Sequence, residues 1–188
     1  MKLKKVFIPV IVIILIIFII VGREKIAHRD VEKQFDFWVK LIDSNDKFTQ
    51  MGAVRALGEL GDKRAVKLLI PLLKDEDLWV KVETIRSLGN LGDKETVEPL
   101  IDLLQTSVNP PVRREAATSL GLLGDNRAVV PLIMRLKNDN NALVRVKIIE
   151  ALGMLRDEKA IAPVKYYRSD KDIWVRTEAE RTLGKLSN

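Results

Sequence analysis

The sequence predicts an all-α protein: a right-handed solenoid of about five helical hairpins, preceded by one transmembrane helix. A leucine-glycine motif recurs every 31 or 32 residues, and such a period is typical of a solenoid. Its leucines are Leu57, Leu88, Leu120, Leu152 and Leu183. Before the first copy, residues 6–22 carry no charged or polar side chain, and a helix that is apolar on every side is typical of a membrane span.

Composition limits the classes of protein that fit. Of the 188 residues, 47% are hydrophobic and 5% aromatic, which suits a helical core of leucine, valine and alanine. The absence of cysteine excludes disulfides, thiolate metal sites and cysteine nucleophiles. Of the net charge of +6, three charges come from Lys2, Lys4 and Lys5. The rest of the chain is therefore nearly balanced, and we expect no nucleic-acid partner.

The amino-terminal segment begins with a basic tail, residues 1–5, and continues with the apolar run 6–22. As a helix this run spans roughly 25 Å, slightly less than the roughly 30 Å hydrocarbon core of a bilayer. We interpret it as an uncleaved signal anchor, because no small-residue cleavage motif follows it; a cleaved signal peptide is the alternative. Residues 23–30 are expected to form a helical juxtamembrane linker.

These features predict a single-pass membrane protein. Basic residues are nearly balanced on the two sides of the span, so the positive-inside rule separates the two orientations only weakly. The very short basic tail favours a cytoplasmic amino terminus, with the repeat domain on the extracytoplasmic side.

Each repeat is predicted to contain two helices. In the unit 93–123, apolar residues recur at helical spacing from Val97 to Leu104, and the helical pattern is interrupted at 107–111. A second amphipathic stripe then ends before Gly124, as expected for a glycine in a left-handed helix cap.

Alignment by the period divides the repeat domain, residues 31–188, into five units. The first and last are the most irregular, which suits repeats that cap a stack. The units are about 31–60, 62–91, 93–123, 125–155 and 157–187.

Three motifs resemble HEAT repeats, in particular the short subtype named after phycobilisome (bilin) lyases. They are the Leu-Gly-Asn-Leu-Gly-Asp turn at 88–93, the Ala-Val-Val-Pro-Leu-Ile helix at 128–133, and the Val112-Arg113 pair that opens a second helix. The resemblance covers residues 31–187 and implies a solenoid whose second helices line the concave face. It is weak evidence for function, because this repeat serves many unrelated tasks.

The resemblance also implies a structural ladder between units, in which a loop Asp and a second-helix Arg form hydrogen bonds. In four units an acidic residue or serine stands six positions before a basic residue. We interpret this pattern as inter-repeat bonding rather than a phosphate site. The ladder residues are Asp75, Lys81, Ser107, Arg113, Asp139, Arg145, Asp170 and Arg176.

The outward stripe of the second helices is the predicted binding surface for a protein partner of unknown identity. Its candidate residues are Arg55, Glu59, Glu83, Arg86, Asn90, Glu115, Thr118, Leu122, Lys147, Glu150, Met154 and Arg181. Leu122 and Met154 are either an exposed contact patch or ordinary inter-helix packing residues. We expect Trp79 and Trp174 to pack on the preceding loop rather than to stack on a ligand.

These features favour a membrane-anchored, non-catalytic scaffold with no catalytic residues, metal or cofactor. The single histidine, His28, lies outside the repeats, so the chain lacks the paired His-Glu motifs of di-iron hydroxylases built on similar repeats. The resemblance implies one alternative, a bilin lyase-like or other enzyme-accessory protein that handles a tetrapyrrole or a modified protein substrate. Another is a structural or regulatory subunit of a membrane complex. The oligomeric state is left open.

Overall fold

A computed structural model describes residues 30–186, which form helices and turns but no strand. Within this range no helix has the length and apolar character needed to cross a bilayer. The predicted anchor, residues 6–22, lies outside the described residues, as does most of the linker 23–30. The handedness of the solenoid stays a prediction.

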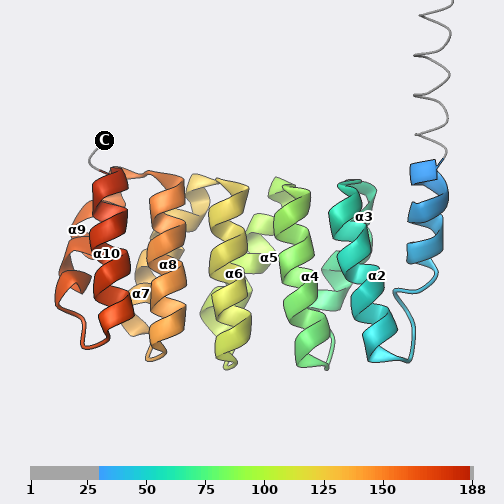
Figure 1. The fold of residues 1–188 in the computed structure, drawn as a ribbon, viewed down its shortest axis with the longest axis horizontal. Helices are drawn as coiled ribbons and strands as arrows, with labels where there is room; N and C mark the ends of the chain where they lie inside the picture. The colour runs from blue at the N-terminus through green and yellow to red at the C-terminus, as the bar shows by residue number, and fades with distance from the viewer. Residues whose placement is uncertain (1–29, 187–188) are drawn as a thin grey trace, which may run out of the picture.

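The described helices form a row of hairpins (Figure 1). The second helices, here called the helix-B layer, are α2 (Lys47–Leu60), α4 (Leu78–Leu91), α6 (Pro110–Leu123), α8 (Ala142–Leu155) and α10 (Ile173–Leu186). The first helices, here called the helix-A layer, are residues 30–39, α3 (Arg64–Leu69), α5 (Val97–Thr106), α7 (Val129–Asn138) and α9 (Ile161–Tyr166). The all-α repeat class is thus confirmed, and the stacked hairpins are consistent with a solenoid.

Short 3-10 segments complete the helix-A layer. They are η1 (Ile70–Lys74), η2 (Lys94–Thr96), η3 (Asn126–Ala128), η4 (Glu158–Ala160) and η5 (Tyr167–Ser169). Pro71 accounts for η1, because its ring removes a backbone N–H and clashes with the preceding helical turn. The first helix of that unit therefore changes to 3-10 geometry after Leu69.

Local sequence sets both ends of the helix-B elements. At the start of α4 the Asp77 carboxylate accepts hydrogen bonds from the N–H groups of Trp79 and Val80, and this cap satisfies donors that have no partner within the helix. At the other ends, three glycines adopt the left-handed conformation, with φ of 69°, 67° and 62°. They are Gly61, Gly92 and Gly124.

Small residues bring neighbouring helices of the helix-B layer close together. A Cβ atom placed on Gly89 would lie 2.7 Å from the Cβ of Ser119, across the seam between α4 and α6. The Ser119 hydroxyl donates to the backbone oxygen of Ile85 across the same seam, at 3.0 Å. The first glycine of the repeated motif therefore serves helix packing, whereas the second serves the cap.

One apolar core runs between the two layers along the whole described chain. The motif leucines Leu57, Leu88, Leu120 and Leu152 are completely buried in it. At the amino-terminal end, Phe35 and Ile42 join the first hairpin to this core.

Candidate functional site

Two arginines at the starts of helix-B elements form buried ion pairs with the next unit. Arg113 donates to both carboxylate oxygens of Asp139, at 2.6 and 2.9 Å. Arg145 donates in the same way to Asp170, at 3.0 and 2.8 Å. Because bidentate Arg-carboxylate bonds are strong and geometrically specific, these pairs set the stacking of the third, fourth and fifth units.

The loop residue at the ladder position also forms a local hydrogen bond. In every unit its side chain accepts a hydrogen bond from the N–H two residues later, which shapes the loop before helix B. The accepting residues are Ser44, Asp75, Ser107, Asp139 and Asp170. Serine performs this local task as aspartate does, but only aspartate can also pair with a cation from the preceding unit.

The ladder changes where Ser107 replaces an aspartate. Lys81, the predicted basic partner at this step, makes no side-chain hydrogen bond or ion pair with any residue in the range 30–186. Asp75 instead pairs with Lys47 at 3.2 Å. Arg176, in the last unit, donates to the backbone oxygen of Asp170 within its own hairpin, at 2.8 Å.

Asp139 is the most heavily bonded ladder carboxylate. Burial raises its pKa, but the hydrogen bonds from Arg113, from the Asn141 N–H and from Arg135 outweigh burial and lower its pKa below the usual range. The pKa of Asp170 is also lowered against the effect of burial. Both groups are therefore held as carboxylates at neutral pH.

The middle of the helix-B face carries a second set of ion pairs between units. Arg55 donates to Glu83 at 2.9 and 3.2 Å, and Arg86 donates to Glu115 at 3.0 and 3.3 Å. The two glutamates were predicted to face outward, but they are only 5% and 8% exposed. The prediction missed this burial because the closely spaced helices cover the carboxylates, while the guanidinium groups remain accessible.

In the fourth unit the order of the charges along helix B is reversed, because a basic residue comes first and an acidic residue follows it. Lys147 donates to Glu150 at 2.7 Å within α8. Arg181 lies 3.7 Å from Glu150 and bonds more closely, at 2.9 Å, to Glu178 of its own helix. In the third unit the equivalent position holds the uncharged Thr118, whose hydroxyl donates to a backbone oxygen of its own helix. Much of the predicted binding stripe is therefore occupied by bonds within the protein.

The remaining candidates lie near the carboxyl ends of the helix-B elements. Glu59, Asn90, Leu122 and Met154 are all exposed. Leu122 is 54% and Met154 40% exposed, so both apolar side chains are accessible to a partner. The sulfur of Met154 would also lie 3.0 Å from a Cβ on Gly121, so Met154 contributes to packing as well.

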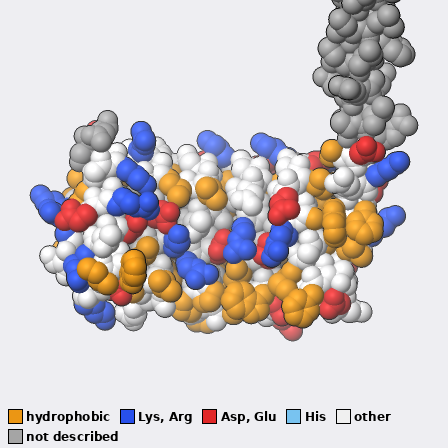
Figure 2. Space-filling model, in the orientation of Figure 1, with side chains coloured by type: hydrophobic (Ala, Val, Ile, Leu, Met, Phe, Trp, Pro, Cys, Tyr) orange, Lys and Arg blue, Asp and Glu red, His pale blue; other side chains and the backbone are white. Residues whose placement is uncertain are grey.

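Apolar residues form a row at the opposite, amino-terminal ends of the helix-B elements; Pro111 is half-buried and the other four are exposed. Each is the second residue of its helix, and we call them the amino-terminal row: Phe48, Trp79, Pro111, Leu143 and Trp174. Figure 2 shows hydrophobic side chains gathered along this lower edge of the helix-B face. Trp79 and Trp174 were expected to pack on the preceding loop, but they are 57% and 69% exposed.

Two hollows follow this row. The first holds about 460 Å³ and lies between α2 and α4; its lining residues include Phe48, Met51, Trp79 and Val82. The second holds about 300 Å³ between α6 and α8. Arg114 lines both hollows, which together we call the row groove.

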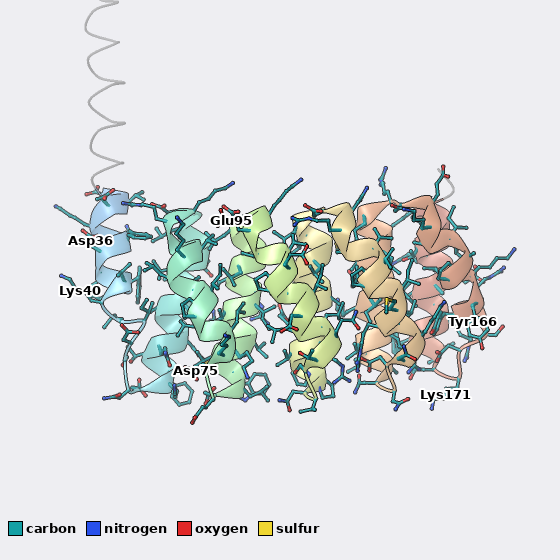
Figure 3. All side chains as sticks on the ribbon, turned by 180° about the vertical axis from the view of Figure 1, so that it is seen from behind. Asp36, Lys40, Asp75, Glu95, Tyr166 and Lys171 are labelled. Atoms are coloured by element: carbon teal, nitrogen blue, oxygen red, sulfur yellow. The ribbon has the colours of Figure 1, made fainter. Side chains whose placement is uncertain are left out.

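Another hollow, of about 590 Å³, lies between the last two units at the loop edge. Tyr166 and Lys171 line it, and both are seen at the carboxyl-terminal end of the solenoid in Figure 3. Its buried charges already bond within the protein, since Arg145 pairs with Asp170 and Asp139 pairs with Arg113. This hollow therefore offers mainly exposed lysines and one exposed tyrosine to a ligand.

The buried polar side chains form hydrogen bonds within the fold. In the described part of the chain, every buried side-chain nitrogen or oxygen has a hydrogen-bond partner. In the same part, no group of three or more His, Cys, Asp or Glu side chains is placed to hold a metal ion. The surface features that remain are the exposed guanidinium groups and the amino-terminal row.

The row groove was not predicted. Its only signal in the sequence was the large apolar residue found just before the Val-Arg or Val-Lys pair in most units, for example Trp79 before Val80-Lys81. A residue at the start of an amphipathic helix has the same sequence signature whether it packs on a loop or faces solvent. The signal therefore located the row but not its exposure.

Comparison with known proteins places the chain among repeat proteins. A family model of HEAT repeats matches residues 35–121, 69–146 and 129–188. No curated protein matches the sequence. Among solved structures, the complex of CpcE and CpcF of phycocyanin lyase from Nostoc sp. PCC7120 is similar, with a TM-score of 0.71 and 25% identity.

That match covers 81% of this chain and 65% of the phycocyanin lyase chain, so this chain spans less than two thirds of its length. An engineered protein is also similar, with a TM-score of 0.59 and 24% identity, and the match covers 81% of this chain and 79% of the other. The latter likeness concerns the fold alone.

Proposed function

This chain belongs to the HEAT-repeat family, and from that premise we propose that it is a non-catalytic scaffold that binds a partner protein through its helix-B face. The observation that carries the proposal is the amino-terminal row with its groove, since a contiguous exposed apolar surface is typical of an interaction site. The similar phycocyanin lyase structure is itself a complex of two chains, which supports a role in protein association.

Photo-crosslinking in cells tests this proposal. A photoreactive amino acid replaces Leu143 in the amino-terminal row, Leu122 elsewhere on the helix-B face or, as a control, Met134 on the helix-A layer; the three native side chains are 56%, 54% and 56% exposed. We expect a discrete crosslinked partner from position 143 or position 122 and none from position 134. Crosslinks from none of the three positions would contradict the scaffold, and crosslinks from position 134 alone would place the interface on the helix-A layer.

We further propose that residues 6–22 hold the scaffold at a membrane, with the repeats on the extracytoplasmic side. The support is the length of the uncharged run and the basic tail before it. The full-length protein should stay with membranes in alkaline carbonate, whereas a variant lacking residues 6–22 should be released. A carboxyl-terminal tag should be digested by protease added to intact cells or spheroplasts; protection of the tag would reverse the orientation.

A second candidate is an accessory role in handling a tetrapyrrole or a modified protein substrate. It is supported by the likeness to phycocyanin lyase and by the apolar walls and arginines of the row groove. If this role applies, a bilin mixed with excess protein should change its visible absorbance spectrum. An unchanged spectrum would remove this candidate and leave the scaffold proposal standing.

A further inference from the structure

The amino-terminal row shares its surface with positive charge. Phe48 and Trp79, which are 82% and 57% exposed, stand at the first hollow. Three arginines and one glutamate are the charged residues that line the row groove: Arg55, Arg86, Arg114 and Glu83. The groove thus combines aromatic side chains, which anchor apolar groups in interfaces, with guanidinium groups, which bind carboxylates.

Glu83, the acidic residue that lines the row groove, lies beneath the basic ones, whereas the exposed carboxylates of Asp46 and Glu76 lie in the loops before α2 and α4. The Glu83 side chain is 6% exposed, whereas the side chains of its two partners, Arg55 and Arg86, are 58% and 43% exposed. A molecule that approaches the groove therefore meets the guanidinium groups first. Buried carboxylates hold these guanidinium groups in place, so less side-chain entropy is lost when a ligand binds them.

Arg114 has free bonding capacity. Its guanidinium makes no hydrogen bond or ion pair with another residue of the described part of the chain. Its position at both hollows puts this charge in the middle of the row groove. The guanidinium group can therefore form a bidentate bond with a carboxylate of a ligand.

The dimensions suit an extended peptide segment. From α2 to α8 the groove crosses three inter-helix steps of about 9 Å each, or roughly 27 Å in all. An extended chain covers this distance with about eight residues, because each adds about 3.3 Å. Alternate side chains of such a segment point to the same side, so apolar anchors and carboxylates can reach the row together.

The position of the row favours a partner protein over the anchoring membrane. In Figure 1 helix 30–39 begins at the upper edge of the solenoid, whereas the helix-B elements begin at the lower edge. The chain therefore enters the repeats at the edge opposite the amino-terminal row. An anchor formed by residues 6–22, as proposed, would therefore join the repeats at the edge away from the row.

We propose that the row groove binds an extended, acidic segment of a partner protein that carries aromatic or large aliphatic side chains between its carboxylates. This inference rests on the proposed scaffold function and names the site and the chemistry of its partner. Because exposed guanidinium groups contribute to the binding, the affinity falls as salt is added.

Selection from a random peptide library tests the proposal. Twelve-residue peptides displayed on phage are selected against the full-length protein in detergent micelles. We expect the enriched sequences to have a negative net charge and at least one aromatic or large aliphatic residue. Enrichment of neutral or basic sequences would overturn the proposal.

Matched variants then locate the site, with a labelled copy of an enriched peptide and fluorescence anisotropy as the readout. Trp79→Ala and Arg114→Glu should each raise the Kd by about tenfold or more. The controls are Trp174→Ala, at the same repeat position outside the groove, and Lys185→Glu, an exposed cation of α10; both should leave the Kd within about twofold. Circular dichroism verifies the fold of each variant, and Arg114→Gln replaces the glutamate variant if that one unfolds.

The outcomes separate this inference from the scaffold proposal. Peptides that bind equally well to Trp79→Ala and Arg114→Glu would overturn the groove assignment while leaving the scaffold role in place. A lack of enriched peptides would overturn the inference, and photo-crosslinking from the helix-B face would still decide the scaffold role by itself.

Discussion

One residue departs from the repeat at a position where the backbone requires a left-handed conformation. After α8 the chain needs a left-handed residue, and Arg156 supplies it with φ 51° and ψ 32°. Equivalent turns use glycine, which has no Cβ to clash with the carbonyl oxygen. Arg156 is thus a strained cap, and its replacement tests how much this strain costs.

Arg156→Gly should raise the free energy of unfolding by about 0.5–1 kcal/mol. Relief of the left-handed strain, about 1–2 kcal/mol, exceeds the extra entropy that glycine adds to the unfolded chain. Urea denaturation followed by circular dichroism measures the change. A lower stability would mean that Arg156 contributes bonds that outweigh its strain.

Asp139 accepts more hydrogen bonds than any other carboxylate of the ladder. Asp139→Asn leaves Arg113, whose side chain is only 7% exposed, without its carboxylate. We expect a loss of about 3–5 kcal/mol of unfolding free energy, as for other broken buried ion pairs. The matched control is Glu98→Gln, which removes an exposed carboxylate bonded to Arg127 and should cost less than about 1 kcal/mol.

The lowered pKa of Asp139 and Asp170 also predicts the pH dependence of stability. A carboxylate with a lowered pKa in the folded state stabilises the protein above its unfolded pKa, near 3.9, and this contribution is lost as the pH falls through the folded pKa. Urea denaturation between pH 7 and pH 2 should therefore show stability falling below about pH 4. The slope should be smaller in Asp139→Asn; an equal slope would contradict a lowered pKa at this residue.

At the scale of helices, the helix-B layer depends on close approach. The glycine that opens each Leu-Gly-x-Leu-Gly turn faces a small residue of the following helix, as Gly89 faces Ser119. Side chains of any larger size would push the helices apart. The same approach buries Glu83 and Glu115, so helix packing decides which charges a partner can reach.

Gly89→Ala should therefore destabilise the protein, because its Cβ would meet the side chain of Ser119 at 2.6–2.7 Å. We expect a loss of about 1–3 kcal/mol, typical of overpacking. Gly52→Ala is the control, since Gly52 lies inside α2 with no atom within 4 Å of the new Cβ. That substitution should stabilise by about 0.5–1 kcal/mol through helix propensity, so opposite signs in thermal denaturation would establish the packing role.

The whole molecule is a one-dimensional stack in which each hairpin packs mainly against its neighbours. Its stability is therefore close to a sum of repeat and interface contributions. The third unit occupies the middle of the stack and joins the two halves. A defect in its core should weaken both of its interfaces.

Leu120→Ala should lower the free energy of unfolding by about 2–5 kcal/mol, because Leu120 is completely buried in this central unit. Leu122→Ala, two residues along the same helix and 54% exposed, should change it by less than about 0.5 kcal/mol. Urea denaturation of the pair tests the helix register. Similar losses at the two positions would mean that the assignment of buried and exposed faces is wrong.

The caps and the apolar stripes were predictable from the sequence, because each depends on residues within a turn or two of one another, and the period was predictable because one motif recurs every 31 or 32 residues. Asp77 caps the helix that follows it, and Leu120 repeats the spacing of Leu88. The inter-unit pairing of Arg113 with Asp139 was anticipated only through the resemblance to HEAT repeats.

Tertiary structure alone decided which side chains a partner can reach. Glu83 and Trp79 both follow the repeat, yet one is buried beneath two arginines and the other is exposed beside a groove. Exposure depends on the distance between adjacent helix-B elements, which contacts such as Gly89 with Ser119 set over about thirty residues of sequence. Local periodicity identifies a helix face, but only the packed neighbour determines whether that face is covered.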